Sequence, residues 1–495
     1  MLNYIKYFTN VFRYFILQTF LRKFFFSFKS QFSKLTNYTN IFTNQGNDES
    51  KVIWIFDYSS FFHKPSSAFL GIMFYAKTLI HLGYKTFFIT CDGSPNSCNI
   101  GFQTLSPNSD MPCKSCIRNR NNLIPKKLQL NFSEYATEQF NNKEIENFNY
   151  LHGLQNIFAN SKPSGKSKEI IEKRMTKGAN AWINNMQNLI IKNGKPKIIY
   201  LFNGRTYPEN IISFWAKKNN INIRYFENGS RKNSIFFSRE YAALNIINSK
   251  NSKPKEKELK KIDKLIDNKV RAKVDPFSFV NWNNNKDLKI NNKYEKCFSI
   301  FLNLPYDTSQ INTHTVFSNI YEWIDEIIKF TELYPKYLFI FNTHPAEYDP
   351  KRPSREKLYK YVRLKTKLLD NVKIRKPFNN ISSYKMLNLS SGVLTYNSTI
   401  GLEARILKIP VVEAAETHYS RNKIIKIVKN KADWDRRFKA LMDGNLNILD
   451  EENLNKLKAY YSEFLLENNF QIEIEEELDI KYYLNLFKKE IKYIK

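Results

Sequence analysis

Two sets of polar residues in the second half of this 495-residue chain have the chemistry to bind a phosphate group. They are His344-Pro345 and Asn397-Ser398-Thr399. Each set directly follows an apolar run with the length and composition of a β-strand and precedes a segment of helical pattern, which is typical of β-α units. Residues just past the carboxyl ends of parallel strands line the ligand crevice of an open sheet. We therefore expect both sets to face one crevice, where the second also opens a helix whose free N–H groups favour an anion.

The order of these residues resembles the pattern of a known family. His344-Pro345, then Ser398-Thr399 with Gly-Leu-Glu-Ala at 401–404, resembles the capsular polysaccharide synthesis family, which includes bacterial β-Kdo transferases. The pattern is also similar to the HP and S-S/S-T pair of bacterial sialyl- and polysialyltransferases. A third sialyltransferase element, an acidic residue followed two positions later by glycine, is matched by 227–229. The resemblance covers residues 296–420 well and the first half of the chain loosely.

These families are two-domain GT-B glycosyltransferases that use CMP-activated acidic sugars. The resemblance therefore implies an α/β, GT-B-like fold of two Rossmann-like domains with a cleft between them. It implies a metal-independent enzyme that moves a sugar of the Kdo or sialic acid type from a CMP-sugar donor to a glycan or glycolipid acceptor. The product would be a surface or capsular polysaccharide, and no cofactor is expected for catalysis.

The resemblance also assigns roles on the donor side. His344 is expected to be catalytic, because it can stabilise the charge that develops on the leaving phosphate together with the hydroxyls of Ser398 and Thr399. Glu403, about one helical turn further on, is expected to accept from the ribose hydroxyls. The alternatives are a histidine that only caps a strand end and an exposed acid on a helix. The expected nucleotide-binding residues are His344, Pro345, Asn397, Ser398, Thr399, Gly401 and Glu403.

The acceptor hydroxyl must lose a proton during transfer. Glu227 is the candidate general base, by resemblance to the acidic residue of sialyltransferases, and it is expected in a loop just past the strand-like run 221–226. Asp57 and Asp307 are rival carboxylates. A retaining mechanism would make a scheme with one base wrong.

The first half of the chain also carries β-α-β patterns, with strand-like runs at 51–57, 85–90, 197–202 and 221–226. The loops after the strand-like runs supply the expected acceptor-side residues, which are Asp57, Asn203 and Arg205, with Asp307 in the second half. Arg205 offers a fork of donors to a carboxylate or phosphate. The alternatives are that Asp57 caps a helix or a turn, that Asn203 only forms a turn and that Arg205 is a surface ion-pair partner.

Four cysteines lie close together in the sequence: Cys91, Cys98, Cys113 and Cys116. Four thiols in a loop rich in Pro, Gly, Asn and Ser could close a tetrahedral structural zinc site. The gaps between them are uneven, and Cys91 continues a strand-like run where an ordinary buried thiol is the alternative. Five cysteines in a chain of this length favour a cytoplasmic protein over a disulfide scaffold.

The charge of the chain predicts an acidic partner. The net charge is +30, and residues 1–47 contain six Lys or Arg and no acid, interleaved with aromatic residues. The uncharged apolar run 14–21 within them is far shorter than the ~20 residues that span a bilayer. We expect segment 1–47 to be an amphipathic helix on an anionic membrane surface, at the inner face of the plasma membrane. The alternative is a helix packed on the protein's own body.

Composition divides the remaining chain. We expect an N-terminal Rossmann-like acceptor domain at 48–250, a charged linker at 251–295, a C-terminal Rossmann-like donor domain at 296–425 and C-terminal helices at 426–495. GT-B enzymes often send a late helix back to the first domain, and one of these helices could do so.

Two rival functions stay open. One is a CDP-polyol phosphotransferase of the teichoic-acid type, which shares the HP element. The other is a non-catalytic basic binding protein on a GT-B scaffold, although nucleic acid is not the partner we expect. The sequence contains neither a GxGxxG fingerprint nor a GxxxxGK[ST] loop, which counts against dinucleotide enzymes and P-loop NTPases.

Overall fold

The protein is described here from a computed structural model. The structure describes residues 48–56, 66–104, 111, 113–132, 145, 148–231, 233–241, 256–270, 293–348, 353–376, 382–420, 424–473 and 479–494. These residues form two compact units. The N-terminal unit holds the described residues within Phe12–Phe158, Lys162–Asn245 and Leu465–Lys495, and the C-terminal unit those within Ala159–Ser161 and Ile246–Phe464. Asp57 and segment 1–47 lie outside the described residues, so what was expected of them stays a prediction.

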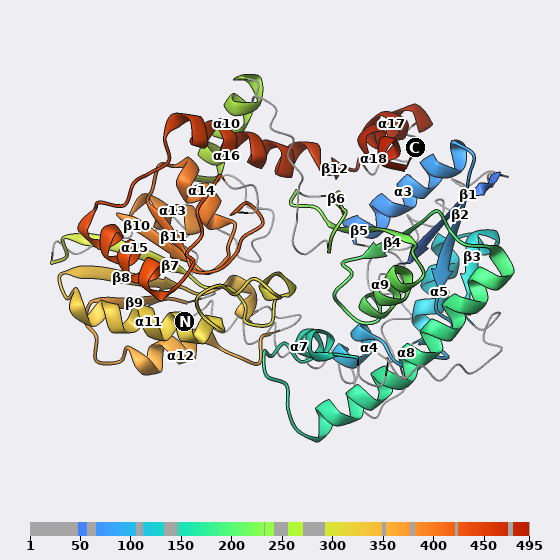
Figure 1. The fold of residues 1–495 in the computed structure, drawn as a ribbon, viewed down its shortest axis with the longest axis horizontal. Helices are drawn as coiled ribbons and strands as arrows, with labels where there is room; N and C mark the ends of the chain where they lie inside the picture. Colours follow the sequence, from blue (N-terminus) through green and yellow to red (C-terminus); the bar gives the residue numbers. More distant parts are fainter. Residues whose placement is uncertain are drawn as a thin grey trace, which may run out of the picture. The chain divides into compact units, whose positions relative to one another are not determined.

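The N-terminal unit is built on one sheet (Figure 1). Its strands, as far as the structure describes the chain, lie in the order β12 (Asn469–Gln471), β6 (Ser234–Ser238), β5 (Asn222–Asn228), β4 (Ile198–Phe202), β1 (Asp48–Phe56), β2 (Tyr84–Thr90) and β3 (Gln129–Asn131). Strands β1 to β5 run parallel, whereas β6 and β12 extend one edge, where β6 pairs antiparallel with β5 and β12 pairs antiparallel with β6.

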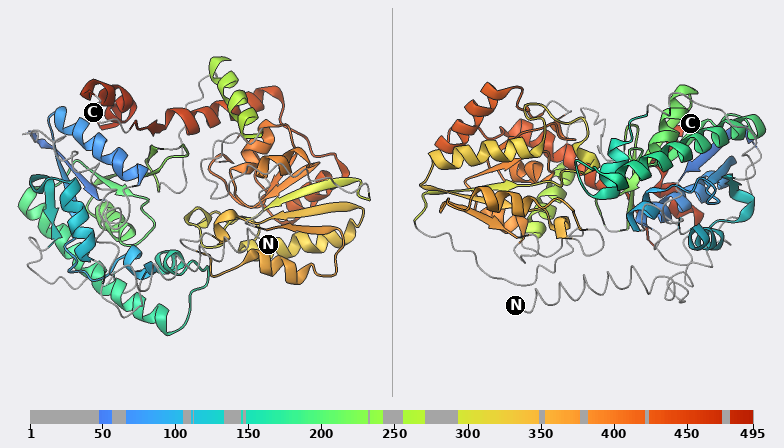
Figure 2. Two further views of the ribbon diagram at one scale, coloured as in Figure 1. Left: turned by 180° about the vertical axis from the view of Figure 1, so that it is seen from behind. Right: turned by 90° about the horizontal axis from the view of Figure 1, so that it is seen from below.

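The residues of β1 alternate between two cores, because successive side chains of a strand point to opposite faces. Trp54 and Phe56 lie in a core with α8 (Lys166–Asn193) and α9 (Glu209–Lys218). Ile53 and Ile55 lie in a core with α3 (Ser67–His81), α17 (Ile480–Leu486) and α18 (Lys488–Ile494). Helices thus cover both faces of the sheet (Figure 2), which explains the continuous apolar runs of its central strands.

The C-terminal unit is a second three-layer α/β sandwich. Its described strands are all parallel and lie in the order β11 (Val411–Glu413), β10 (Gly392–Thr395), β7 (Lys296–Phe301), β8 (Tyr337–Asn342) and β9 (Val372–Arg375). One face packs on α11 (Ile320–Leu333), α12 (Leu358–Lys365) and α15 (Lys431–Asp443). The other face packs on α13 (Ser383–Asn388) and α14 (Ile400–Ile406), with α10 (Glu256–Val270) and α16 (Glu451–Ser462) outside them.

Both sheets have Rossmann topology. If the parallel strands of each unit are numbered in chain order, their order across the sheet is 3-2-1-4-5. The direction of winding therefore reverses between β1 and β4 in one sheet and between β7 and β10 in the other. The predicted two Rossmann-like domains of a GT-B-like α/β fold are therefore confirmed. Ligands bind such sheets at the carboxyl ends of the strands, at the point of reversal.

The predicted segment boundaries differ from the structure in two places. Helix α10 lies inside the predicted linker 251–295 and belongs to the C-terminal unit. The predicted C-terminal helices 426–495 are divided: α15 and α16 complete the C-terminal unit, and the chain from Leu465 onward belongs to the N-terminal unit, where β12 pairs with β6. The return of a late segment to the first domain is thus observed. Among the described residues, none of the helices is long and apolar enough to span a bilayer.

Candidate functional site

The carboxyl edge of the C-terminal sheet gathers the predicted donor-side residues. Asn342 at the end of β8 lies opposite Phe301 of β7, and Phe301 lies opposite Thr395 at the end of β10. The strands that precede His344 and Ser398 therefore end level with one another, two strand spacings or about 10 Å apart. Both predicted sets therefore follow the same edge of the sheet, and the set at 397–399 follows β10, which borders the β7–β10 reversal point.

His344 is a neutral hydrogen-bond donor in this setting. Its Nδ1 accepts the backbone N–H of Ala346 at 3.1 Å, so the proton of the neutral ring is on Nε2. The side chain is exposed, yet protein atoms crowd the ring, and this desolvation lowers the pKa of His344 below its ordinary value. The charge of Arg375 acts in the same direction, and Asp307 opposes it. His344 can therefore offer its Nε2–H to an anion without being charged.

Arg375 was not predicted from the sequence. It ends β9, next to β8, and its side chain is buried. Its Nε donates to Oδ1 of Asn342 at 2.9 Å, and its Nη2 donates to Oγ of Ser383 at 3.1 Å. Burial lowers the pKa of Arg375 to about 10, so the guanidinium stays charged at neutral pH. The edge thus combines a neutral donor with a fixed positive charge, which suits an anionic group.

Asn397 has a positioning role. Its Oδ1 accepts from Nε2 of Gln310 at 2.6 Å, and its Nδ2 donates to the carbonyl oxygen of Ser309 at 3.0 Å. Its side chain is buried. The amide, predicted to bind the nucleotide, instead ties the loop after β7 to the end of β10 across the reversal point.

The hydroxyls of Ser398 and Thr399 have different surroundings. Oγ of Ser398 accepts the N–H of Ile400 at 3.4 Å, which leaves its own proton for another acceptor. Oγ1 of Thr399 lies 3.2 Å from Nε2 of His418. Helix α14 spans seven residues, and the N–H groups of Gly401 and Leu402 donate to carbonyl oxygens just before it. These two N–H groups already have acceptors and cannot serve the predicted anion site. The side chains of Ser398 and Thr399 are the groups that remain for it.

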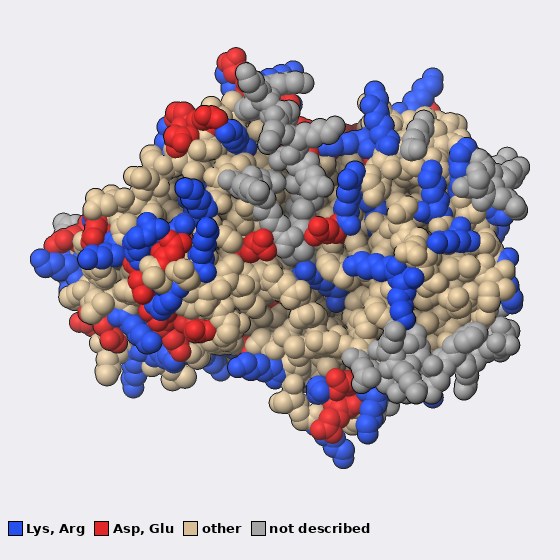
Figure 3. All heavy atoms as spheres, in the orientation of Figure 1, with Lys and Arg blue, Asp and Glu red and all other residues tan. Residues whose placement is uncertain are grey.

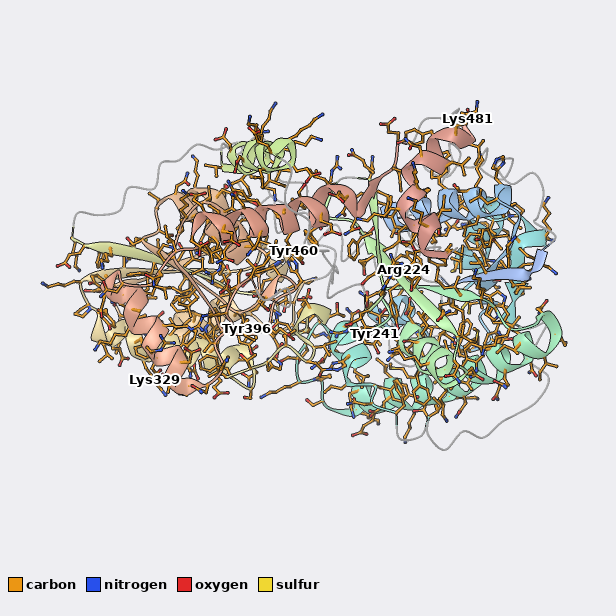
Figure 4. All side chains as sticks on the ribbon, turned by 45° about the horizontal axis from the view of Figure 1, so that its top comes forward. Arg224, Tyr241, Lys329, Tyr396, Tyr460 and Lys481 are labelled. Carbon is orange, nitrogen blue, oxygen red and sulfur yellow. The ribbon has the colours of Figure 1, made fainter. Side chains whose placement is uncertain are left out.

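His418 is a second histidine at this edge that sequence reasoning missed. Burial lowers its pKa to about 3, so the ring is neutral. Its Nδ1 lies 2.7 Å from the hydroxyl of Tyr460 on α16, which Figure 4 labels. Its ring stacks on Phe464 with the ring centroids 4.7 Å apart. His418 thus joins Thr399 to α16 at the end of the C-terminal unit.

Replacing His418 by glutamine is expected to reduce the loss of stability in acid. The pKa of His418 is depressed in the folded state, so below about 6.5 the unfolded chain binds a proton that the folded chain does not. Stability therefore falls with falling pH, and His418 contributes up to about 1.4 kcal/mol per pH unit. Urea unfolding at a series of pH values from neutral to acid gives the free energy of unfolding as a function of pH. The slope of that free energy against pH should be smaller by this amount in His418→Gln. An unchanged slope would show that His418 titrates normally in the fold.

Glu403 is a buried clamp, and the alternative of an exposed helix acid is wrong. One carboxylate oxygen accepts from Nζ of Lys269 on α10 at 2.6 Å and from the hydroxyl of Tyr461 on α16. The other accepts from the hydroxyl of Tyr384 on α13 at 2.8 Å. The carboxylate thus holds three helices to α14, and a ribose at this position would have to share it with three donors of the chain.

Gly401 is required by close packing behind the site. A Cβ at this position would lie 2.6 Å from Oη of Tyr419, 3.1 Å from Oγ1 of Thr395 and 3.2 Å from Oε1 of Glu413. The Tyr419 hydroxyl donates to the carbonyl oxygen of Ser398 or to Glu413, so it cannot move without breaking these contacts. The predicted nucleotide-binding role of Gly401 is therefore at most indirect, through the placement of α14.

Gly401→Ala is expected to lower the free energy of unfolding by about 1–3 kcal/mol, the usual cost of overpacking a core. Chemical denaturation of the purified protein measures this loss. Adding Tyr419→Phe removes the atom that the new methyl group would meet, so the double variant should lose less than the sum of the two single variants. Strictly additive losses would contradict the steric explanation.

Asp307 and Pro345 form turns at the same edge. Asp307 caps the turn η6 (Thr308–Gln310), where its carboxylate accepts the N–H of Ser309 at 2.8 Å, and its side chain is exposed. Pro345 begins the turn η7 (Pro345–Tyr348), in which the N–H of Glu347 donates to the carbonyl oxygen of His344. Pro345 therefore helps to fix the backbone of His344.

Three predicted residues of the N-terminal unit, Asn203, Arg205 and the candidate base Glu227, also come together. Asn203, in the left-handed region with φ 53°, donates from Nδ2 to Oε2 of Glu227 at 2.7 Å, and its Oδ1 accepts the N–H of Arg205 at 3.1 Å. Arg205 is buried with its guanidinium 4.9 Å from the ring centre of Tyr241, so the alternative that placed it at the surface is wrong. Glu227 lies within β5, paired with Phe236 of β6, rather than in a loop.

The four neighbouring cysteines are half-buried free thiols packed against the two cores, around α4 (Asn99–Thr104) and α5 (Cys113–Leu123). Burial raises the pKa of the Cys91 thiol, and that of Cys98 to about 12, which disfavours thiolates. In the described part of the chain no group of three or more His, Cys, Asp or Glu is placed to hold a metal ion. The structural zinc site and its alternative of ordinary thiols both stay predictions from the sequence.

Comparison with known proteins adds weak similarities. No family model matches the chain, and no curated protein matches it. Among solved structures, the β-Kdo 2,7 transferase KpsC of Thermosulfurimonas dismutans is similar at 13% identity and a TM-score of 0.35, over 62% of this chain and 89% of that one. The β-Kdo 2,4 transferase KpsC of the same organism is similar at 10% identity and a TM-score of 0.35, over 53% of this chain and 79% of that one. UDP-GlcNAc 2-epimerase from Neisseria meningitidis is similar at 13% identity and a TM-score of 0.27, over 84% of this chain and 100% of that one. Such low TM-scores decide nothing about the reaction, which has to follow from this chain's own residues.

Proposed function

We propose that the protein is a glycosyltransferase of surface or capsular polysaccharide biosynthesis. Its donor is a CMP-activated acidic sugar of the Kdo or sialic acid type, and its acceptor is a glycan or glycolipid. The observation that carries the proposal is the neutral imidazole donor of His344 beside the buried cation Arg375, at the carboxyl edge of a Rossmann-like sheet. The resemblance of His344-Pro345 and Ser398-Thr399 to CMP-sugar enzymes supports the donor class.

The chemistry requires charge stabilisation on the donor side. Transfer breaks the bond between the anomeric carbon and a phosphate oxygen of CMP, and it forms a bond from an acceptor hydroxyl oxygen to the same carbon. Negative charge develops on the departing phosphate oxygen. The Nε2–H of His344 and the hydroxyl proton of Ser398 can donate to that phosphate, and Arg375 adds positive potential. Donors that are already oriented lower the barrier, because nothing has to reorganise during the reaction.

The acceptor side is assigned to the N-terminal unit. Glu227 is the proposed base that takes the proton of the acceptor hydroxyl, and its carboxylate is oriented by the amide of Asn203. Segment 1–47 is proposed to hold the enzyme at the inner face of the plasma membrane, where a lipid-linked acceptor would be found.

Calorimetry with CMP tests the proposal. Wild type should bind CMP, and His344→Ala and Ser398→Ala should bind it at least ten-fold more weakly. Lys261→Gln on the exposed side of α10 is the control and should bind like wild type. Transfer assays with CMP-Kdo, CMP-sialic acid and CDP-glycerol identify the donor. Turnover of CDP-glycerol alone would replace the proposal by a polyol phosphotransferase, and absence of CMP binding in folded protein would refute it.

Asp307→Asn is expected to shift the acid limb of the pH profile of kcat/KM to lower pH. The negative charge of Asp307 raises the pKa of His344, so removing that charge lowers this pKa further. His344 then stays neutral to lower pH, while asparagine can still accept the N–H of Ser309. The rate at neutral pH should be close to that of wild type. If Asp307 were the general base, the rate would instead fall by about 10²-fold or more at every pH.

A further inference from the structure

Two adjoining grooves lie on the outer surface of α17 and α18 in the N-terminal unit. The larger has a volume of about 460 Å³, and its apolar lining comes from Leu82, Leu484 and Ile491. The second has a volume of about 350 Å³, and its apolar lining includes Leu466, Phe470 and Leu486. Lys488 and Lys492 line both grooves, and Lys481 lines the larger one. The surface therefore combines aliphatic hollows with a row of lysines.

Three described carboxylates near this surface, among them Glu467 in the lining of the second groove, have bonding partners of their own. Glu490 is buried and receives two bonds from Arg224, at 2.7 and 2.6 Å. Glu467 pairs with Lys489 at 3.4 Å. Asp479 caps α17 by accepting the N–H of Lys481 at 3.3 Å.

Within the described residues, none of the ion pairs includes the ammonium groups of Lys481, Lys488 or Lys492, all of which are exposed. Figure 4 labels Lys481 on α17, and Figure 3 shows Lys and Arg atoms with few acidic atoms on the face of the N-terminal unit around α3 and α17. Three further glutamates, at 475–477, lie outside the described residues.

The two helices are firmly held on their inner side. Tyr483, Phe487 and Ile494 are buried in the core under α3, and the Arg224–Glu490 pair connects α18 to β5. Anchoring on the inner side leaves the lysines and the grooves on the outer side as a fixed surface. A cationic row without ion-pair partners among the described residues, beside apolar hollows, is complementary to an anionic amphiphile.

We propose that this lysine-rimmed surface docks onto a bilayer that contains anionic lipids. Lys481, Lys488 and Lys492 contact headgroup phosphates, and the grooves between them receive the apolar part at the bilayer boundary. The residues that line the two grooves include no arginine, so phosphate is met by point charges and base stacking is not favoured. This contact is separate from the expected contact of segment 1–47, and it does not depend on the transferase assignment.

Photo-crosslinking from Asn485, an exposed residue that lines both grooves, tests the proposal in the full chain. Benzoylphenylalanine at 485 should form a lipid adduct with vesicles of phosphatidylcholine and phosphatidylglycerol, and little with phosphatidylcholine alone. The adduct should decrease in high salt, since screening weakens lysine–headgroup attraction. The same probe at Ile191, 71% exposed on α8 of the same unit, is the positional control and should give no lipid adduct.

Charge reversal provides the second arm. The triple variant Lys481→Glu, Lys488→Glu and Lys492→Glu should lose the adduct at 485 by at least ten-fold, because each lysine near an anionic surface contributes to binding. Reversal of three lysines on α10, Lys257, Lys261 and Lys264, is the matched control and should leave the adduct unchanged.

The proposal is overturned if folded protein gives no lipid adduct at 485. It is also overturned if the adduct joins two copies of the chain, or if 485 and 191 react equally. Vesicle binding through segment 1–47 alone would appear in co-sedimentation without an adduct at 485. CMP binding by the same preparations reports on the transferase proposal separately.

Discussion

His344→Ala is expected to lower kcat by about 10²- to 10³-fold, which is the usual effect of removing one oriented donor from a developing oxyanion. The Nε2–H of His344 is set in place before the donor arrives, because the N–H of Ala346 occupies Nδ1. The interaction strengthens as charge builds on the phosphate, so kcat should fall more than KM rises. Steady-state assays at saturating donor, with the CMP-sugar identified by the donor screen, measure both parameters.

Two variants decide whether the effect belongs to the imidazole. His344→Gln places an N–H donor near the position of Nε2, so it should retain more activity than the alanine variant. His81→Ala, at an exposed histidine in the last turn of α3, should behave like wild type. Full activity in His344→Ala, with folding confirmed by circular dichroism, would remove His344 from the mechanism and with it the main support for the proposed function.

Strands whose two faces are both covered by helices could be predicted from the local sequence. The runs at 337–342 and 392–396 are largely apolar because helices cover both sides of β8 and β10, and such runs have strand length. Once two strands of a parallel sheet were identified, the polar residues after them had to lie at one edge. The positions of His344 and Ser398 were therefore open to prediction without any long-range information.

Partners supplied by distant parts of the chain could not be predicted in this way. Arg375 ends the short strand β9, whose sequence Val-Lys-Ile-Arg alternates in polarity and does not mark the arginine as buried. His418 meets Thr399 only because β11 and its following turn lie beside β10. The helical position of Glu403 looks exposed from its neighbours in sequence, yet α10, α13 and α16 cover it.

The resemblance to CMP-sugar enzymes also assigned binding roles to residues whose hydrogen bonds in the structure change those roles. Asn397 follows β10, as the motif requires, but its amide is committed to Ser309 and Gln310. The N–H groups at the start of α14 were expected to bind phosphate, and those of Gly401 and Leu402 already have carbonyl partners. A short motif therefore places residues at the correct edge, but the number of hydrogen bonds left for a ligand depends on the surrounding loops.

Glu403→Ala is expected to lower the free energy of unfolding of the C-terminal unit by about 3 kcal/mol, because it leaves a largely buried ammonium without its carboxylate. Lys269 keeps 19% of its side chain exposed, which places the loss at the lower end of the range for broken buried pairs. Two buried tyrosine hydroxyls lose their acceptor in the same change. Urea unfolding followed by tryptophan fluorescence measures the transition, with Glu451→Ala on the surface of the same unit as the control that should unfold like wild type.

The same carboxylate allows the family-based role of Glu403 to be separated from its role in the fold. Glu403→Ala combined with Lys269→Met removes both charges, and it should be more stable than Glu403→Ala alone, since no buried ion is left unpaired. Glu403→Gln keeps the shape of the side chain and changes only its charge. If Glu403 also accepts from a ribose hydroxyl, wild type should bind CMP more tightly than 2′-deoxy-CMP, and Glu403→Gln should reduce that preference. Equal binding of both nucleotides by wild type would leave Glu403 as a clamp between helices, because a carboxylate that already accepts from Lys269 and two tyrosines then has no further partner in the ligand.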